Sequence, residues 1–235
     1  MIRALIPDEV NALGFLLLVF VGVFLPILII KSARRLGTGP LPISRPRFYK
    51  QTIIFQLFIA ALAAWTSYTH GILTMPMPQW PLLGWSTAAV MYVVTVLTLK
   101  LRWPSRSAAS KQRLYDILPH NSGEMVPYVF VCIAAGIAEE FVYRGVMTEL
   151  AQRLIGIEMV TIVAVSISFA ASHATQGLRG MIAVFGIALI CHALVLLSQS
   201  LIPVMVFHFA YDLTAGMLIP RWFETLGIRK AAEQG

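Results

Sequence analysis

Seven long apolar stretches dominate this sequence and limit the folds that it can adopt. Hydrophobic residues make up 58% of the chain and charged residues only 12%, which is far from the composition of a soluble globular domain. Each stretch is about as long as the roughly 17 to 25 residues that a helix needs to cross a bilayer. They cover approximately residues 12–30, 52–68, 82–99, 126–150, 158–175, 181–197 and 201–220. We therefore predict an all-α fold, a polytopic membrane helical bundle of about seven to eight transmembrane helices.

No internal repeat, low-complexity tract or soluble domain separates these stretches. The first one follows Asp8 and Glu9, is too long for the core of a signal peptide, and has no small-residue cleavage pattern after it. We expect it to be retained as a membrane span. Residues 1–235 are accordingly predicted to form a single integral membrane domain.

The basic residues, which give a net charge of +7, lie mainly in particular loops and so indicate topology, with no groove for nucleic acid. The loops 31–50 and 100–125 are rich in Lys and Arg, whereas 70–81 has neither. If the spans alternate, the positive-inside rule places fifteen of the eighteen Lys and Arg residues in the cytoplasm. We predict a protein of a bacterial plasma membrane, with the lipid bilayer as a partner, the N-terminus outside and the C-terminus cytoplasmic.

Two glutamates and an arginine interrupt the fourth apolar stretch, in the sequence AEEFVYRG at residues 138–145. Ionised groups at membrane depth cost at least a few kcal/mol each, so they tend to pair, to line cavities and to mark function. In an α-helix Glu140 and Arg144 share one face, whereas Glu139 points away from Arg144. The pattern predicts a structural ion pair between Glu140 and Arg144. A packing role alone would need only one glutamate, so Glu139 is left free for proton chemistry.

Two further polar groups follow at helical spacing, Phe169 with His173 in FAASH and His208 with Asp212 in HFAYD. A carboxylate, two imidazoles and an acidic partner at membrane depth are the groups needed to deprotonate water and to stabilise an oxyanion. We therefore predict a hydrolytic site formed by Glu139, His173, His208 and Asp212.

These motifs resemble those of the CPBP intramembrane proteases, also called the Abi or type II CAAX protease family. The family pattern is EExxxR, then FxxxH, then HxxxN or HxxxD, all on membrane helices. The resemblance covers roughly 75 residues and implies an intramembrane endopeptidase with its catalytic core at 126–220. It implies a membrane-associated peptide or a C-terminal tail as substrate, without indicating whether a prenyl group is attached.

The resemblance also implies a role for each motif residue. Glu139 would activate a water molecule together with His173. His208 and Asp212 would occupy the position that stabilises the oxyanion. Phe169 would have a packing role beside them, while the ion pair described above holds the helix geometry.

Asp212 stands where some members of the family carry Asn, and this difference bears on the mechanism. An amide can donate a hydrogen bond to an oxyanion, but an ionised carboxylate only accepts one, so Asp212 is expected to orient His208 or to be protonated. The four polar residues are also plausible zinc ligands, although the HExxH helix of metalloproteases is absent. We favour metal-free hydrolysis and keep zinc as an alternative, with Glu139, His173, His208 and Asp212 as its ligands.

The same residues can be checked against the requirements of other classes of membrane protein. An aspartyl protease is excluded, because Asp8 and Asp116 lie outside the spans and leave only one aspartate at membrane depth. A serine protease is disfavoured, because the glycine-flanked nucleophile turn is missing. A proton-coupled transporter remains a rival, since buried Glu, His and Asp residues also form proton relays. A non-catalytic immunity or binding protein on the same scaffold is the other alternative.

Overall fold

The all-α bundle expected from the sequence is confirmed. The computed structural model describes residues 9–36, 42–72, 77–78 and 80–233, and these residues contain helices but no β-strand. Parts of the expected loops 31–50 and 70–81 lie outside the described residues. The elements, in chain order, are α1 (Ala12–Val19), η2 (Phe20–Phe24), α2 (Leu25–Leu36), α3 (Arg45–Thr69), α4 (Pro81–Arg102), α5 (Ala108–Ile117), α6 (Ser122–Glu139), η3 (Glu140–Met147), α7 (Thr148–Ile155), α8 (Glu158–Ala171), η4 (Ala174–Gln176), α9 (Leu178–Ser198) and α10 (Ile202–Glu233).

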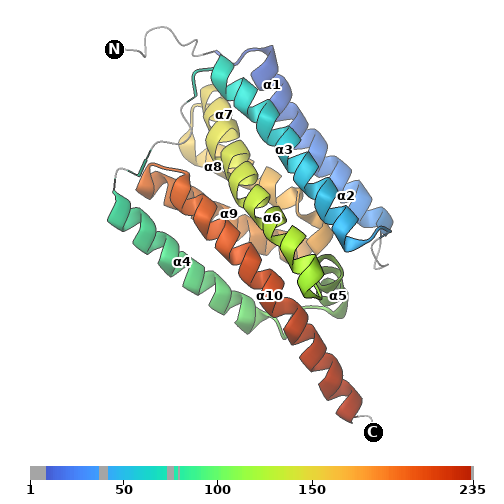
Figure 1. Cartoon of the computed structure of the whole chain (residues 1–235). Helices are drawn as coiled ribbons and strands as arrows, with labels where there is room; N and C mark the ends of the chain where they lie inside the picture. Colours follow the sequence, from blue (N-terminus) through green and yellow to red (C-terminus); the bar gives the residue numbers. More distant parts are fainter. Residues whose placement is uncertain (1–8, 37–41, 73–76, 79, 234–235) are drawn as a thin grey trace.

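Among the described residues, six continuous helices are long and apolar enough to cross a membrane: Ala12–Arg35, Arg45–Thr69, Pro81–Arg102, Ser122–Ile155, Leu178–Ser198 and Ile202–Thr225. The first is formed by α1, η2 and α2, and the fourth by α6, η3 and α7. Consecutive helices run in opposite directions through the bundle (Figure 1). The apolar helix α8 is shorter, with 14 residues. In the chain it lies between the fourth and fifth of these helices.

The expected stretch 158–175 is helical over a shorter range than predicted. Helix α8 ends at Ala171, and His173 lies in the turn before η4 instead of on the helix. The hydroxyl of Ser172 and Nδ1 of His173 both bond the carbonyl oxygen of Phe169, at 2.7 and 2.9 Å. Side chains that capture a backbone carbonyl in this way compete with continuation of the helix.

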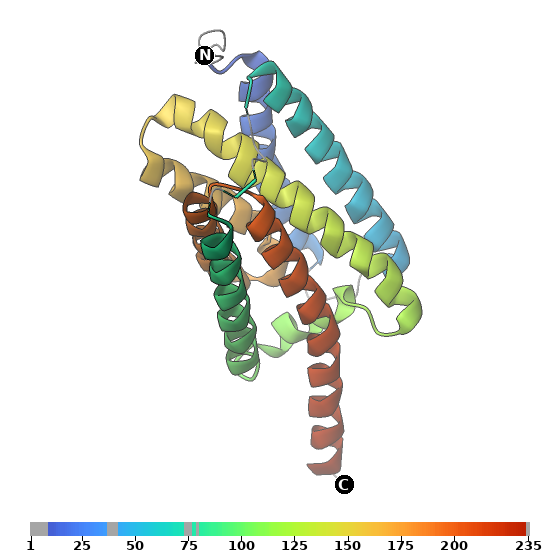
Figure 2. The ribbon, with the colours of Figure 1, turned by 60° about the vertical axis from the view of Figure 1, so that its left-hand side comes forward.

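The basic loops gather at one end of the bundle. There the Arg45 side chain donates to the carbonyl of Asp116 at 2.8 Å, and Arg113 donates to the carbonyl of Thr175 at 2.8 Å. These bonds join the start of α3, helix α5 and the turn after α8, and we call this the basic end. Helix α10 extends beyond the other helices on this side (Figure 2). Which side of the membrane it faces remains a prediction.

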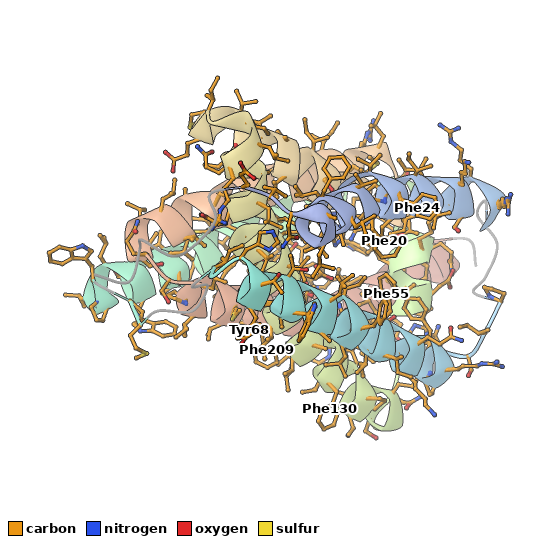
Figure 3. The ribbon with its side chains drawn as sticks, turned by 90° about the horizontal axis from the view of Figure 1, so that it is seen from above. Phe20, Phe24, Phe55, Tyr68, Phe130 and Phe209 are labelled. Carbon is orange, nitrogen blue, oxygen red and sulfur yellow. The ribbon has the colours of Figure 1, made fainter. Side chains whose placement is uncertain are left out.

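Large aromatic side chains cover the outside of the bundle, as expected for contact with lipid. Phe55, Tyr68 and Phe130, labelled in Figure 3, are 41%, 80% and 57% exposed. A soluble protein rarely leaves so much apolar surface uncovered. The chain is therefore an integral membrane protein.

Helices α6 and α10 approach each other closely at Gly136. A Cβ atom at this position would lie 2.9 Å from the carbonyl oxygen of Met205 and 3.1 Å from the backbone nitrogen of Phe209. Since the absence of a side chain lets two helix backbones meet, Gly136 brings the glutamates that follow it next to His208.

This contact predicts that Gly136→Ala destabilises the protein, because the added methyl group separates α6 from α10. The matched control is Gly186→Ala in α9, where a Cβ meets nothing within 4 Å. Both changes gain the same helix propensity, about 1 kcal/mol. Thermal unfolding in detergent should show a lower melting temperature for Gly136→Ala and an equal or higher one for Gly186→Ala; equal melting temperatures for the two variants would contradict this account.

Candidate active site

The centre of the site is Glu140, which is completely buried. Its Oε1 atom accepts hydrogen bonds from Arg144 Nη1 at 3.2 Å and from His208 Nδ1 at 2.7 Å. The ion pair expected from the sequence is thus present, and it lies wholly inside the protein. The contact with His208 was not predicted, and it makes Glu140 the link between η3 and α10.

Glu140 begins η3, a segment of π-helix that extends to Met147. In this wider helix Glu140 and Arg144 still face the same direction, since four residues remain close to one turn. The guanidinium of Arg144 lies 4.1 Å from the centre of the Phe169 ring, a distance typical of a cation–π contact. Phe169 therefore packs against the arginine of the buried ion pair.

Glu139 holds its two carboxylate oxygens in different surroundings. Oε1 accepts a hydrogen bond from Gln56 Nε2 at 3.0 Å. Oε2 lies 4.0 Å from Nε2 of His173 and 4.0 Å from Nε2 of His208, and it has no hydrogen-bond partner among the described residues. A separation of 4.0 Å is too long for a direct hydrogen bond, but one water molecule can bridge it.

Hydrogen bonds to the two Nδ1 atoms fix the histidine rings. Nδ1 of His173 lies 2.9 Å from the carbonyl oxygen of Phe169, which can only accept, so this nitrogen carries the proton and Nε2 faces Glu139. Nδ1 of His208 donates to Glu140 in the same way. Nε2 of His208 lies 3.4 Å from Oδ2 of Asp212, so carboxylates stand at both nitrogens of this ring.

All four predicted site residues, Glu139, His173, His208 and Asp212, line one cavity of about 220 Å³. Glu140 and Arg144 form part of its wall. A larger cleft of about 730 Å³ lies between α4 and α9 and reaches the basic end. The cavity and the cleft share part of their lining, including Arg106 and Tyr211. The cleft therefore lies next to the cavity of the predicted site residues, on the side of the basic end.

The cleft is positively charged. It is lined by Arg102, Arg106, Arg113 and Arg179 and by no aspartate or glutamate. Burial lowers the pKa of the Arg106 guanidinium, the nearby Arg102 lowers it further, and Tyr211 opposes the change. Arginine nonetheless remains protonated in proteins, so the cleft attracts anionic groups.

The spacing of the polar groups can be compared with what a metal ion requires. Zinc bonds of about 2.0–2.1 Å place tetrahedral ligand atoms roughly 3.3–3.4 Å apart, whereas the Glu139 carboxylate is 4.0 Å from each histidine nitrogen. Within the described part of the chain, no three His, Cys, Asp or Glu side chains are grouped to hold a metal ion. The separations from Glu139 are therefore longer than the spacing of two ligands on one zinc ion, whereas His208 Nε2 and Asp212 Oδ2, at 3.4 Å, have that spacing.

Sequence reasoning missed Gln56 as a member of the site. Its amide is buried, 8% exposed, and it lies on α3, far from every motif residue in the sequence. The available signal was an uncharged polar side chain within the apolar stretch 52–68. That signal is weak, because polar side chains in membrane helices often serve only as packing contacts.

Comparison with known families agrees with this geometry. Residues 121–214 match the family model of Type II CAAX prenyl endopeptidase, Rce1-like, and the matched range contains all the motif residues from Glu139 to Asp212. This part of the chain is similar to the Rce1-like family. No curated protein and no solved structure gives a significant match. The Rce1-like match indicates a CAAX-type intramembrane protease and leaves helices α1 to α5, with Gln56, outside the matched range.

The burial of the central ion pair in the Rce1-like segment predicts a large effect of Glu140→Gln on stability. The change leaves the Arg144 charge buried without its counter-ion, which typically costs about 3–5 kcal/mol. The matched control is Glu149→Gln, which removes an equally spaced pair with Arg153 whose glutamate is half exposed and should cost less than about 1 kcal/mol. The free energy of unfolding, measured by denaturant titration in detergent, should separate the two variants clearly. Similar losses of unfolding free energy in both variants would show that the buried ion pair stabilises the fold no more than the exposed one.

Proposed function

We propose that this protein is an intramembrane endopeptidase in which Glu139 and His173 activate a water molecule for attack on a peptide bond. The observation that supports this most directly is the position of Glu139 Oε2, which lies 4.0 Å from Nε2 of both His173 and His208. A water molecule between these three atoms would have the polar partners that a buried water requires. It would also be held next to a base, as hydrolysis demands.

The proposed reaction uses each group once in a defined role. Glu139 takes a proton from the water as its oxygen bonds to the carbonyl carbon of the peptide, and His173 orients that water. His208, whose two ring nitrogens both face carboxylates, donates from Nε2 to the resulting oxyanion. When the tetrahedral intermediate collapses and the C–N bond breaks, the proton on Glu139 passes to the leaving amine.

This mechanism assigns positioning roles to the remaining acids. Glu140 holds His208 through Nδ1, and Asp212 accepts from Nε2 of the same ring when no substrate is present. Asp212 therefore does not need to donate a hydrogen bond to the oxyanion, which an Asn at this position could do. The 4.0 Å spacing supports metal-free chemistry over zinc.

The proposed substrate is a membrane-associated peptide or a C-terminal tail. Both the name of the matched family, a CAAX prenyl endopeptidase, and the basic cleft support this choice. The cleft has apolar walls as well as arginines, so it suits a peptide that carries both apolar and anionic groups.

A proton-coupled carrier is the second candidate, because a separate observation favours it. A cavity of about 290 Å³ reaches Arg144 from the side of Gln199 and Ser200, so the Glu140–Arg144 pair separates two cavities. Such an arrangement resembles the closed centre of an alternating-access carrier. In proteoliposomes a carrier would move protons or solute without any peptide product, whereas the protease would cleave peptide without flux.

The protease account predicts that Glu139→Gln abolishes cleavage while leaving the fold intact, because the amide keeps the shape but cannot accept the proton. Activity should fall by about 10²–10⁴-fold. The assay uses purified protein in liposomes and an internally quenched peptide ending in a CAAX-type sequence, with and without a prenyl group. Glu158→Gln, at an exposed position, is the control. Retention of full activity by Glu139→Gln would end the assignment of Glu139 as base.

A second prediction concerns the route of the substrate. Gly186 lines the cleft and has open space beside it, so Gly186→Trp should obstruct the cleft, while Gly186→Ala leaves it open. We expect the tryptophan variant to raise KM with little change in kcat, since the chemistry of the inner site is untouched. Unaltered KM for cleavage of the same quenched peptide would show that substrate reaches the site by another route.

A further inference from the structure

Gln56 is the one described side chain outside the matched range 121–214 that forms a hydrogen bond with Glu139. It lies on α3, and its Nε2 donates to Oε1 of Glu139 at 3.0 Å. Gln56 is only 8% exposed in a helix that otherwise presents large apolar residues to lipid. A buried amide in such surroundings is unfavourable unless it is hydrogen-bonded, so the contact explains how an amide is tolerated here.

The hydrogen bond distinguishes the two oxygens of the glutamate. Oε1 is occupied by the amide, and this leaves Oε2 directed toward Nε2 of His173 and of His208. Without the amide the carboxylate could rotate about its last side-chain bond, because that torsion is broad. A rotated carboxylate would no longer hold a water molecule between both histidines.

We propose that Gln56 is the positioning residue for Glu139: its amide fixes which carboxylate oxygen meets the water. This inference rests on the proposed function for its kinetic consequence, but the hydrogen bond itself can be tested without any substrate. Helix α3, in the first half of the chain, would then contribute a functional side chain to the site in addition to supporting the bundle.

The surroundings of the amide leave room for water as well. Oε1 of Gln56 is buried and has no hydrogen-bond partner among the described residues. A cavity of about 150 Å³ is lined by Gln56, Glu139, Tyr143 and His173. His208 of α10 is not part of this lining. This volume accommodates water that could donate to the amide oxygen, so the amide can bond on both sides without turning away from Glu139.

The groups that face Glu139 define what a change at Gln56 would alter. His173 and His208 approach Oε2, and Tyr143 lines the neighbouring cavity. Asp212 stands behind His208. Among the described residues, only Gln56 lies close enough to form a direct hydrogen bond with the Glu139 carboxylate. Removal of this bond should therefore leave the carboxylate free to rotate.

The kinetic test compares Gln56→Met with Gln51→Met. Methionine has nearly the shape of glutamine but no donor, and Gln51 lies exposed on the same helix. With the quenched CAAX-type peptide, Gln56→Met should lower kcat by roughly tenfold to a hundredfold with little change in KM, as expected for a misplaced catalytic group. Gln51→Met should match the wild type.

The second test needs no substrate. Experimental structures of the wild type and of Gln56→Met compare the orientation of the Glu139 carboxylate directly. In the wild type Oε2 should lie near 4.0 Å from Nε2 of His173 and of His208, whereas in Gln56→Met the carboxylate should be rotated because its donor has been lost. Gln56→Leu gives a second variant if the methionine protein proves unstable.

The outcomes separate this inference from the proposed function. If Gln56→Met keeps the wild-type kcat and carboxylate orientation while Glu139→Gln is inactive, the role of Gln56 is overturned and the protease stands. If the carboxylate rotates as expected but no peptide is cleaved even by the wild type, the positioning of Glu139 stands and the protease assignment fails. An unchanged carboxylate orientation overturns the inference whatever the kinetics show.

Discussion

The buried hydrogen bonds of Glu140 hold the rest of the site in place. This carboxylate joins Arg144 on its own helix to His208 on α10, and it does so without any exposure to solvent. Charges at such depth are stable only when they are paired and hydrogen-bonded. The close approach at Gly136 is what allows the pairing, because α6 and α10 could not otherwise meet. Backbone packing and charge compensation thus depend on each other.

Two adjacent glutamates can take different roles because their surroundings differ. Glu140 faces the interior of the bundle and is fully engaged, while Glu139 is partly exposed to the cavity and keeps one oxygen without a hydrogen-bond partner among the described residues. A group that is committed to structure cannot also exchange protons freely. The arrangement leaves Glu139 available for the acid–base role that we propose for it, in the way that differing surroundings separate the roles of paired carboxylates at known active sites.

Local spacing predicted much of this site, and long-range packing decided the rest. The four-residue separation of Glu140 and Arg144 was sufficient to predict their ion pair, and hydropathy located the spans. The π-helical segment was not predictable, because no local pattern in the sequence distinguishes its wider turns from an α-helix. The end of α8 before His173 depends on side chains capturing a carbonyl, and the contact from Gln56 depends on how α3 packs against α6. No local pattern encodes these contacts.

The most direct test of the account is the identity of the species between Glu139, His173 and His208. A high-resolution experimental structure of the protein, purified without chelator and analysed for metal content, would determine it. The account predicts a water molecule within about 2.6–3.2 Å of Glu139 Oε2 and of the histidine nitrogens, together with full cleavage activity after chelation. A stoichiometric metal ion bound at about 2.0–2.1 Å to these atoms, with activity lost on its removal, would contradict it.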